Sequence, residues 1–272
     1  MLTDILYALA VVGLIGLIAG VLLALVSHFF SVPENEQKKK LRGALPGINC
    51  GACGYKGCDD YAAALAEGTE TRANLCVPGA DTVSLELCVI LGVSAQDVEE
   101  RVAFVHCNGN CSATSKKADY QGVSTCRAAS ALYGGTSSCL YGCLGLGDCA
   151  AVCPANAICI KDGIARINQK LCMGCGVCMS ACPKALISLR PTTSATAVIC
   201  NSREKGAVAR KICKNACIGC KKCEKACPSD AIKVVNDLAV IDYEKCTGCG
   251  LCADTCPVKC IQNVSIDVSV IN

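Results

Sequence analysis

Cysteine is the side chain on which the chemistry of this chain depends. It accounts for 28 of 272 residues, and four cysteine groups end in Cys-Pro, at Cys153, Cys182, Cys227 and Cys256. Three of these groups have the unbroken spacing Cys-x-x-Cys-x-x-Cys-x-x-x-Cys-Pro. In this spacing three thiolates hold one [4Fe-4S] cluster and the fourth reaches a neighbouring cluster. The pattern therefore predicts one-electron transfer.

A disulfide framework is the other common explanation of so many cysteines. Disulfide-rich domains are short and secreted, whereas this chain is long and places its cysteines in closely spaced triples that cannot all pair. Trp is absent and only 4% of residues are aromatic. Cluster binding must therefore supply much of the folding free energy. The net charge of +3 is too small to indicate a nucleic-acid partner.

The ligand sets follow from the rule that paired motifs exchange their fourth cysteine. The regular motifs predict three sets, which are Cys217, Cys220, Cys223 and Cys256; Cys246, Cys249, Cys252 and Cys227; and Cys172, Cys175, Cys178 and Cys153. One upstream group is stretched, and the same rule gives it Cys139, Cys143, Cys149 and Cys182.

A separate four-cysteine group precedes these motifs, at Cys50, Cys53, Cys58 and Cys76. Glycines between its first members let the backbone wrap closely around a cluster, and a helix is expected from Tyr61 to Ala66. The alternative is a structural zinc site held by the same four thiols. We favour iron and sulfide, which brings the expected number of [4Fe-4S] clusters to five.

Several cysteines lie outside these motifs. Cys107, Cys111 and Cys126 form an incomplete set that Cys200 or Cys213 would complete as a sixth cluster, and the sequence does not choose between the two. Buried free thiols are the alternative for this set. Packing is also the expected role of Cys88 and of Cys260, which replaces Ala157, Leu186 and Ala231 of the other repeats.

One transmembrane helix is expected to anchor these groups. Residues 5–30 carry no charge and are long enough to cross a bilayer. A signal peptide is the alternative, but a basic start and an Ala-x-Ala site are missing. Lys38, Lys39, Lys40 and Arg42 follow the helix and Asp4 precedes it. This bias predicts a single-pass protein of the cell (inner) membrane, with its N-terminus outside and its iron-sulfur domains in the cytoplasm.

The expected fold class is α+β, with tandem bacterial-type 2[4Fe-4S] ferredoxin-like modules after the anchor and the small four-cysteine domain. The expected boundaries are an anchor over 1–31, a four-cysteine domain over 32–80, a connecting region over 81–136, and modules over 137–198 and 199–272. Hairpins are expected around Asp162-Gly163 and Asn236-Asp237. An isoleucine follows each Cys-Pro at the same offset, and these residues should form the apolar wall over each cluster: Ile158, Ile187, Ile232 and Ile261.

Other chemistry has little support. A glycine fingerprint for NAD or flavin is missing, and the thiols leave no candidate nucleophile, so no catalytic residue is predicted. His106 is expected to be structural. Basic residues gather near the last module, where a solvated face is the favoured explanation and docking of an acidic redox partner is the other: Arg203, Lys205, Arg210, Lys211, Lys214, Lys221, Lys222 and Lys225.

The four-cysteine group at residues 50–76, directly after one membrane helix and ahead of ferredoxin motifs, resembles the B subunit of the Rnf complex, a membrane-bound ferredoxin:NAD+ oxidoreductase. The resemblance covers nearly the whole chain. It implies that this group binds its own [4Fe-4S] cluster and that reduced ferredoxin is the electron donor. It further implies that electrons continue to flavin-bearing membrane and peripheral subunits, reach NAD+ and drive Na+ or H+ outward.

The expected function is thus that of an electron-transfer subunit of an ion-translocating oxidoreductase, with no NAD or flavin site of its own. Within redox chemistry, the alternative is a membrane-bound donor that keeps a cytoplasmic iron-sulfur regulator reduced. From a different class, the alternative is a zinc-stabilised membrane adaptor without redox function. Brown colour that bleaches with dithionite would separate the first two from the third.

Overall fold

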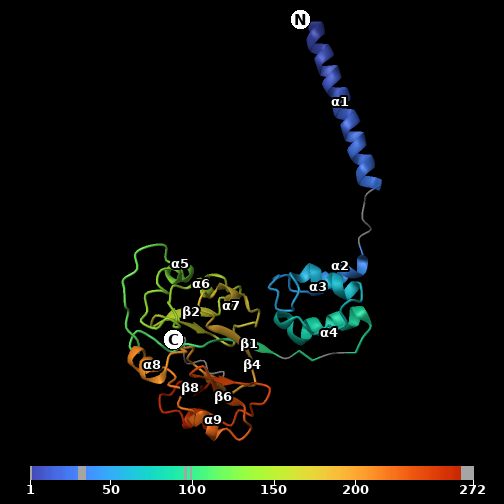
Figure 1. Cartoon of the computed structure of the whole chain (residues 1–272). Coiled ribbons are helices and arrows are strands. Elements are labelled where there is room, and N and C mark those ends of the chain that lie inside the picture. Colours follow the sequence, from blue (N-terminus) through green and yellow to red (C-terminus); the bar gives the residue numbers. More distant parts are fainter. Residues whose placement is uncertain (1, 30–34, 95–96, 99, 265–272) are drawn as a thin grey trace.

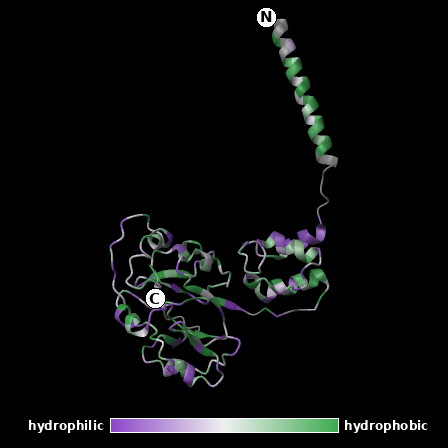
Figure 2. Ribbon diagram, viewed as in Figure 1, coloured by the Kyte–Doolittle hydropathy of each residue, from purple (hydrophilic) through white to green (hydrophobic). Residues whose placement is uncertain are grey.

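The computed structural model describes residues 2–29, 35–94, 97–98 and 100–264. Helix α1 (Leu2–Phe29) extends away from the other elements (Figure 1). Figure 2 shows that it is hydrophobic along most of its length. Its segment Leu9–Val26 is long and apolar enough to cross a membrane, and none of it is buried against the protein. The predicted apolar helix is confirmed, although Phe30 lies outside the described residues.

A small helical domain follows the anchor (Figure 1). It consists of α2 (Glu36–Ala44), α3 (Cys58–Ala66), the 3-10 helix η1 (Val77–Gly79) and α4 (Ala80–Leu91). The Asn35 side chain caps α2 by accepting from the backbone N–H of Gln37 at 3.0 Å. Leu41, Tyr61 and Leu87 form its core and are at most 1% exposed. The predicted helix is confirmed and begins earlier, at Cys58.

Two ferredoxin-like modules make up the rest of the molecule, and each contains two antiparallel strand pairs. In module 1, β1 (Arg101–Val105) pairs with β4 (Ile187–Pro191), and β2 (Ile158–Lys161) pairs with β3 (Ile164–Ile167). In module 2, β5 (Thr196–Val198) pairs with β8 (Ile261–Asn263), and β6 (Ile232–Val235) pairs with β7 (Leu238–Ile241). Both predicted hairpins are present.

The strand pairs move two boundaries that we expected from the sequence. Strand β1 lies within the expected connecting region 81–136, yet it belongs to module 1 because Arg101 pairs with Pro191. Strand β5 lies within the expected module 1, yet Thr196 pairs with Asn263 of module 2. Partners so distant along the chain leave no local signal, whereas two-residue hairpins do. By strand pairing, β1 thus belongs with module 1 and β5 with module 2.

The short helices lie between the strands, next to the cysteines. They are α5 (Cys126–Ala131), α6 (Asp148–Ala151), α7 (Val177–Ala181), α8 (Gly206–Ile212), α9 (Lys222–Ala226) and α10 (Leu251–Asp254). The four repeat isoleucines begin β2, β4, β6 and β8, and each is at most 9% exposed. They belong to the same buried cores as the cysteines, as an apolar wall over each cluster would require.

A buried polar layer joins the modules. The Arg190 side chain is enclosed, and its guanidinium donates to the carbonyls of Ser194 and, at 3.3 Å, Val264, while it lies 5.1 Å from the centre of the Phe104 ring. His106, one residue beyond β1, donates from Nδ1 to the carbonyl of Val198 in β5 at 2.7 Å. Side chains of module 1 thus bond to carbonyls in or next to module 2. These bonds hold the modules in one orientation.

Candidate metal centres

Quartet I (Cys50, Cys53, Cys58 and Cys76) lies in the helical domain. Asn49 orients Cys58 at the start of α3, because its side-chain oxygen accepts from the Cys58 backbone N–H at 2.8 Å. Burial is the main cause that raises the pKa of Cys76 to about 11, and repulsion from the other three sulfurs contributes. Cys53, Cys58 and Cys76 belong to one buried core, and the ligand role of the four thiols stays a prediction.

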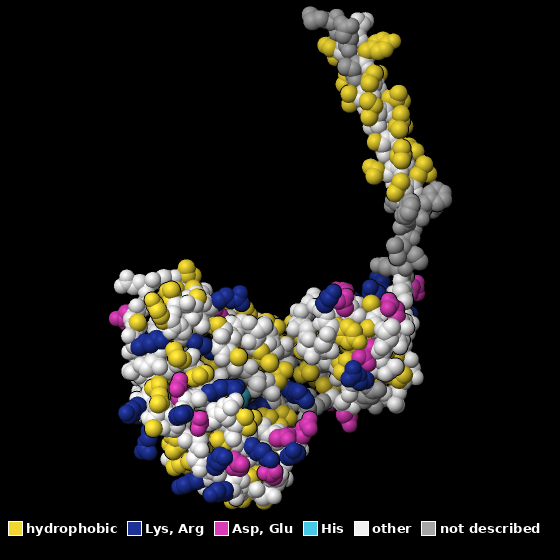
Figure 3. Space-filling model, in the orientation of Figure 1, with side chains coloured by type: hydrophobic (Ala, Val, Ile, Leu, Met, Phe, Trp, Pro, Cys, Tyr) yellow, Lys and Arg dark blue, Asp and Glu magenta, His cyan; other side chains and the backbone are white. Residues whose placement is uncertain are grey.

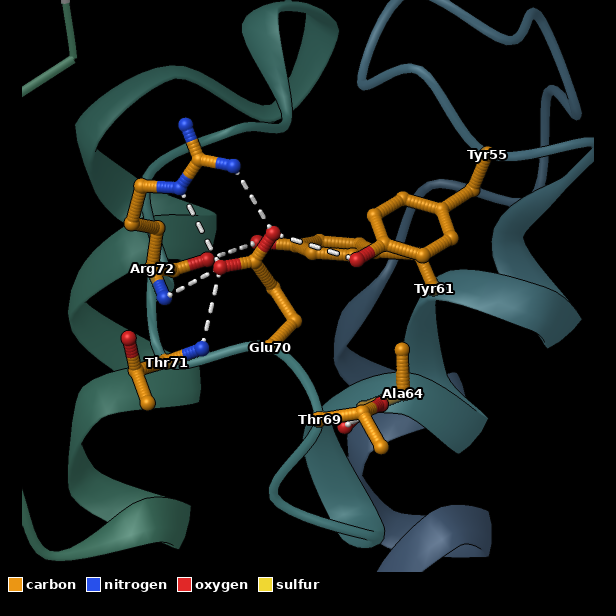
Figure 4. A network of polar contacts seen from close by, with 7 residues as sticks. All are labelled: Tyr55, Tyr61, Ala64, Thr69, Glu70, Thr71 and Arg72. Carbon is orange, nitrogen blue, oxygen red and sulfur yellow. Dashed lines mark hydrogen bonds and ion pairs between the residues drawn. The ribbon is translucent and has the colours of Figure 1, made fainter.

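A polar network fixes the loop that carries Cys76 (Figure 4). The Glu70 carboxylate accepts from the Arg72 side chain at 3.0 and 3.1 Å and from the Tyr55 hydroxyl at 3.1 Å. The bonds from Arg72 are the main cause that lowers the pKa of Glu70 from 4.5 to about 2. The Tyr61 hydroxyl donates to the carbonyl of Arg72 at 2.7 Å. The network thus ties the loop of Cys53 and Cys58, through Tyr55, to the segment that precedes Cys76.

The three regular ligand sets also converge. Quartet II contains Cys153, Cys172, Cys175 and Cys178; quartet V contains Cys217, Cys220, Cys223 and Cys256; and quartet VI contains Cys227, Cys246, Cys249 and Cys252. Each of quartets V and VI lines one space. Burial is the main cause that raises the pKa of Cys178 to about 11, with repulsion from the other sulfurs of quartet II. Cys256 lines the space of quartet V and Cys227 that of quartet VI, so each of these spaces takes one thiol from the paired motif, and their role as cluster ligands stays a prediction.

The stretched group is arranged differently from the sequence expectation. Cys143, Cys149 and Cys182 line one space, as expected, but the fourth thiol there belongs to Cys126. We call this set quartet III. Burial is the main cause that raises the pKa of Cys149 to about 12, and repulsion from Cys143, Cys126 and Cys182 adds to it. Cys139 is absent from this space among the described residues.

Asp148 brings Cys126 to this place. Its carboxylate accepts from the backbone N–H groups of Cys126 at 2.7 Å and Arg127 at 3.0 Å, at the start of α5. A carboxylate at a helix N-terminus satisfies unpaired N–H groups and is favoured by the helix dipole. Because Asp148 directly precedes Cys149, this contact places Cys126 near Cys149 within quartet III. In the sequence motif, Leu146 stands at the middle position that Cys220 occupies in module 2. Cys126 supplies the thiol that Leu146 lacks.

Cys139 joins a further group, quartet IV, with Cys107, Cys200 and Cys213. Burial is the main cause that raises the pKa of Cys139, and Cys213 is the first sulfur that contributes. Cys139 likewise contributes to the raised pKa values of Cys107 and Cys200. A Cβ atom added to Gly109 would lie 3.6 Å from the sulfur of Cys107 and 3.5 Å from that of Cys213. The structure thus includes both candidates, Cys200 and Cys213.

Quartet IV repeats the internal symmetry of the modules. Cys107 stands two residues after β1, and Cys200 stands two residues after β5. Their sulfurs accept equivalent backbone bonds, from Gly109 and Cys143 at 3.4 Å, and from Ser202 at 3.4 Å and Cys217 at 3.3 Å. Cys139 precedes Cys143 by four residues, as Cys213 precedes Cys217. Each module therefore contributes one equivalent pair of thiols.

The thiol surroundings fit iron-sulfur clusters. All 28 cysteines are free thiols, and backbone N–H groups point at many of the sulfurs, for example from Ala157 to Cys153 and from Ala231 to Cys227, both at 3.3 Å. Such donors stabilise an anionic thiolate. Within the described residues, no three Cys, His, Asp or Glu side chains are close enough together to hold a single metal ion. Four thiols spread around a larger space suit a four-iron cluster, in which each iron takes one thiol.

The remaining cysteines are Cys88, Cys111, Cys159 and Cys260. Cys88 is 3% exposed within the helical core, as predicted. Cys111 is exposed beside the β2–β3 turn, where its backbone N–H donates to the carbonyl of Asp162 at 3.0 Å. It differs in exposure from Cys107 and Cys126, with which we grouped it, because those two thiols are buried. His106 is half-buried and bonded on both ring nitrogens, consistent with a structural role.

Comparisons with known proteins agree with this architecture. Residues 45–78 match the family described as "Putative Fe-S cluster", residues 165–188 a "4Fe-4S binding domain" and residues 209–263 a "4Fe-4S dicluster domain". The B subunit of the Na(+)-translocating ferredoxin:NAD(+) oxidoreductase complex of Acetobacterium woodii is 42% identical over 96% of this chain and 78% of its own length. The chain belongs to the family of Rnf complex B subunits.

Two further members of this family support the assignment. The B subunit of the proton-translocating ferredoxin:NAD(+) oxidoreductase complex of Clostridium ljungdahlii is 46% identical over 86% of this chain and 83% of its own length. The B subunit of the ion-translocating oxidoreductase complex of Methanosarcina acetivorans is 37% identical over 88% of this chain and 90% of its own length. The resemblance seen in the first four-cysteine group therefore extends through both ferredoxin-like modules.

Proposed function

We propose that the protein is the membrane-anchored polyferredoxin subunit of an Rnf-type, ion-translocating ferredoxin:NAD+ oxidoreductase. It accepts electrons from reduced ferredoxin and passes them toward the other membrane and peripheral subunits. One [4Fe-4S] cluster in each quartet supplies the reversible uptake of single electrons. The chain itself contributes the ligands, their spacing and a buried apolar environment, and NAD and flavin chemistry belongs to partner subunits.

The continuous order of the quartets carries this proposal. Val77 of η1 packs against Gly174 of the quartet II loop, and Cys50 of quartet I contributes to the raised pKa of Cys175. Quartets II and III share the core of module 1, and quartets V and VI share the core of module 2. The quartets therefore form one sequence of neighbours, from the helical domain behind the anchor to the far end of module 2.

Quartet IV supplies the connection between the modules. The Cys143 backbone of quartet III donates to Cys107, and the Cys217 backbone of quartet V donates to Cys200. A sixth cluster held by quartet IV would thus be linked to each neighbouring quartet through a backbone N–H and a sulfur. Without it, the wall between quartets III and V would contain four unligated thiols, of which Cys107 is 7% exposed. We therefore propose six clusters rather than five.

The two ends of this series of quartets suggest the direction in which electrons flow. Quartet I belongs to the domain that follows α1, so it is the end closest to a membrane anchor. We place the anchor in the cell membrane with the clusters on the cytoplasmic side, in agreement with Lys38, Lys39 and Lys40 after the helix. Quartet VI is the opposite end, and electrons from a soluble donor would enter in module 2.

Module 2 carries charge that suits an acidic donor. Lys221, Lys222 and Lys225 on and beside α9 are exposed and lie close to Cys220 and Cys223 in the sequence. Figure 3 shows many Lys and Arg side chains over this part of the molecule, with fewer Asp and Glu among them. Opposite charge accelerates a transient encounter, and salt screens the effect. We propose that ferredoxin docks here.

Stopped-flow mixing with reduced ferredoxin tests the entry site. Changing Lys221, Lys222 and Lys225 to Glu should slow cluster reduction by at least about tenfold at low ionic strength, and the difference should shrink as salt is added. Lys56, Lys116 and Lys170, which are exposed and lie outside module 2, provide the control, and the same changes there should leave the rate unaffected. An unchanged rate in the α9 variant would remove the docking proposal.

A further inference from the structure

One residue position recurs beside the Cys-Pro cysteine in all four repeats. Ala157, Leu186 and Ala231 donate their backbone N–H to the sulfur of the cysteine four residues earlier, at 3.3, 3.5 and 3.3 Å. Cys260 makes the same backbone bond to Cys256. These residues are at most 2% exposed. The side chain at this position is therefore held inside the site, next to a ligand sulfur.

Only in the fourth repeat, among the described residues, is this side chain a thiol. The Cys260 sulfur lies 3.6 Å from the Cys256 sulfur, and the thiol is also in hydrogen-bonding contact with Cys217. It lines the same space as the four cysteines of quartet V. Cys88 provides a contrast, because it is equally buried but packs in the core of the helical domain and belongs to no quartet. The space of quartet V is therefore lined by five thiols.

We propose that Cys260 is a fifth, reserve ligand of the quartet V cluster. The proposal rests on the assignment of a [4Fe-4S] cluster to this quartet. Two thiols that serve the same iron in turn must lie close together, and Cys256 and Cys260 do. While Cys256 holds the iron, the single Cys260 S–H donates its hydrogen bond to the bound sulfur of either Cys256 or Cys217. When Cys256 is missing, Cys260 loses its proton to solvent and binds the iron in its place, with no change in the number of electrons.

Iron counting on the anaerobically purified full-length protein tests the exchange of ligands. Cys256→Ala should keep the iron content of the wild type, whereas Cys256→Ala with Cys260→Ala should lose about four irons per chain. Cys260→Ala alone should keep all of its iron, because alanine occupies this position in two other repeats. If Cys256→Ala loses one iron or about four, the reserve role is refuted.

Quartet VI offers a matched control. Cys227 is its Cys-Pro ligand, and Ala231 stands where Cys260 stands in quartet V. Cys227→Ala should therefore lose about four irons with no rescue. Adding Ala231→Cys to this variant should restore them, because it recreates the arrangement of Cys256 and Cys260. Failure of both Cys256→Ala and this double variant to hold iron would show that the position cannot ligate.

The hydrogen bond that we propose from Cys260 is tested by a separate measurement. Donors to cluster sulfurs withdraw electron density and raise the reduction potential. An EPR redox titration of Cys260→Ala should therefore show one cluster shifted to a more negative potential, and Cys260→Ser should reverse most of the shift. An unchanged potential would refute the donor role. A wild-type protein without iron would instead refute the proposed function, so the two failures are distinguishable.

Discussion

The assignment of Cys126 to quartet III and Cys139 to quartet IV is tested by combining substitutions. Two ligands of the same cluster should lose that cluster once, whereas ligands of different clusters should lose two. Cys126→Ala with Cys143→Ala should therefore lose no more iron than either single change. Cys139→Ala with Cys143→Ala should lose the sum of the two single losses.

The magnitude follows from the number of quartets. Six clusters contain about 24 irons per chain, and the loss of one cluster removes about four. The pair Cys126 and Cys143 should leave about 20 irons, and the pair Cys139 and Cys143 should leave about 16. The assay is iron and acid-labile sulfide analysis of anaerobically purified, full-length variants, with protein determined by amino-acid analysis.

The sequence-based assignment predicts the opposite result, because it places Cys139 with Cys143. If Cys139→Ala with Cys143→Ala leaves about 20 irons and Cys126→Ala with Cys143→Ala leaves about 16, our reasoning from the structure is wrong. Cys111→Ala is the matched control. Its exposed thiol lies outside every quartet, so its removal should leave the iron content unchanged.

Three other substitutions test the supporting structure. Tyr61→Phe removes the donor to the Arg72 carbonyl and should lower the opening free energy of α3 by about 1–3 kcal/mol, as measured by amide hydrogen exchange. Ile232 is 1% exposed, and Ile232→Ala should lower the opening free energy of β6 by about 2–5 kcal/mol in the same measurement. Val235 is 53% exposed, and Val235→Ala should lower it by less than about 1 kcal/mol. Gly145→Ala places a Cβ against the carbonyl of Gly163 at a φ of 68° and should reduce the iron bound by quartet III. Wild-type exchange in the first two variants, or full iron in the third, would contradict these roles.

The features that the sequence predicted are those encoded by nearby residues. The Cys-x-x-Cys triples place three ligands on one loop, and the turns at Asp162-Gly163 and Asn236-Asp237 join adjacent strands, with φ values of 53° and 77°, and of 51° and 62°. The apolar run of α1 needs no partner within the chain. Local chemistry was therefore sufficient for these elements.

The features that the sequence did not predict depend on distant contacts. The pairing of β1 with β4 joins residues separated by the whole of module 1, and Cys126 reaches quartet III only because Asp148 holds α5. Quartet IV combines loops from two modules. A signal was present, since Cys-x-x-x-Cys occurs at both Cys139 and Cys213, and each module has a cysteine two residues after its first strand. The internal repeat reveals these equivalences once both modules are aligned by their strands.

The most direct test of the relay is to mix the anaerobically purified full-length protein with reduced ferredoxin and follow its visible and EPR spectra. Our account predicts a brown protein with about 24 irons, whose colour bleaches as ferredoxin becomes oxidised and whose reduced clusters give interacting EPR signals. A colourless protein loaded with zinc, or iron-sulfur clusters that reduced ferredoxin leaves oxidised, would contradict it.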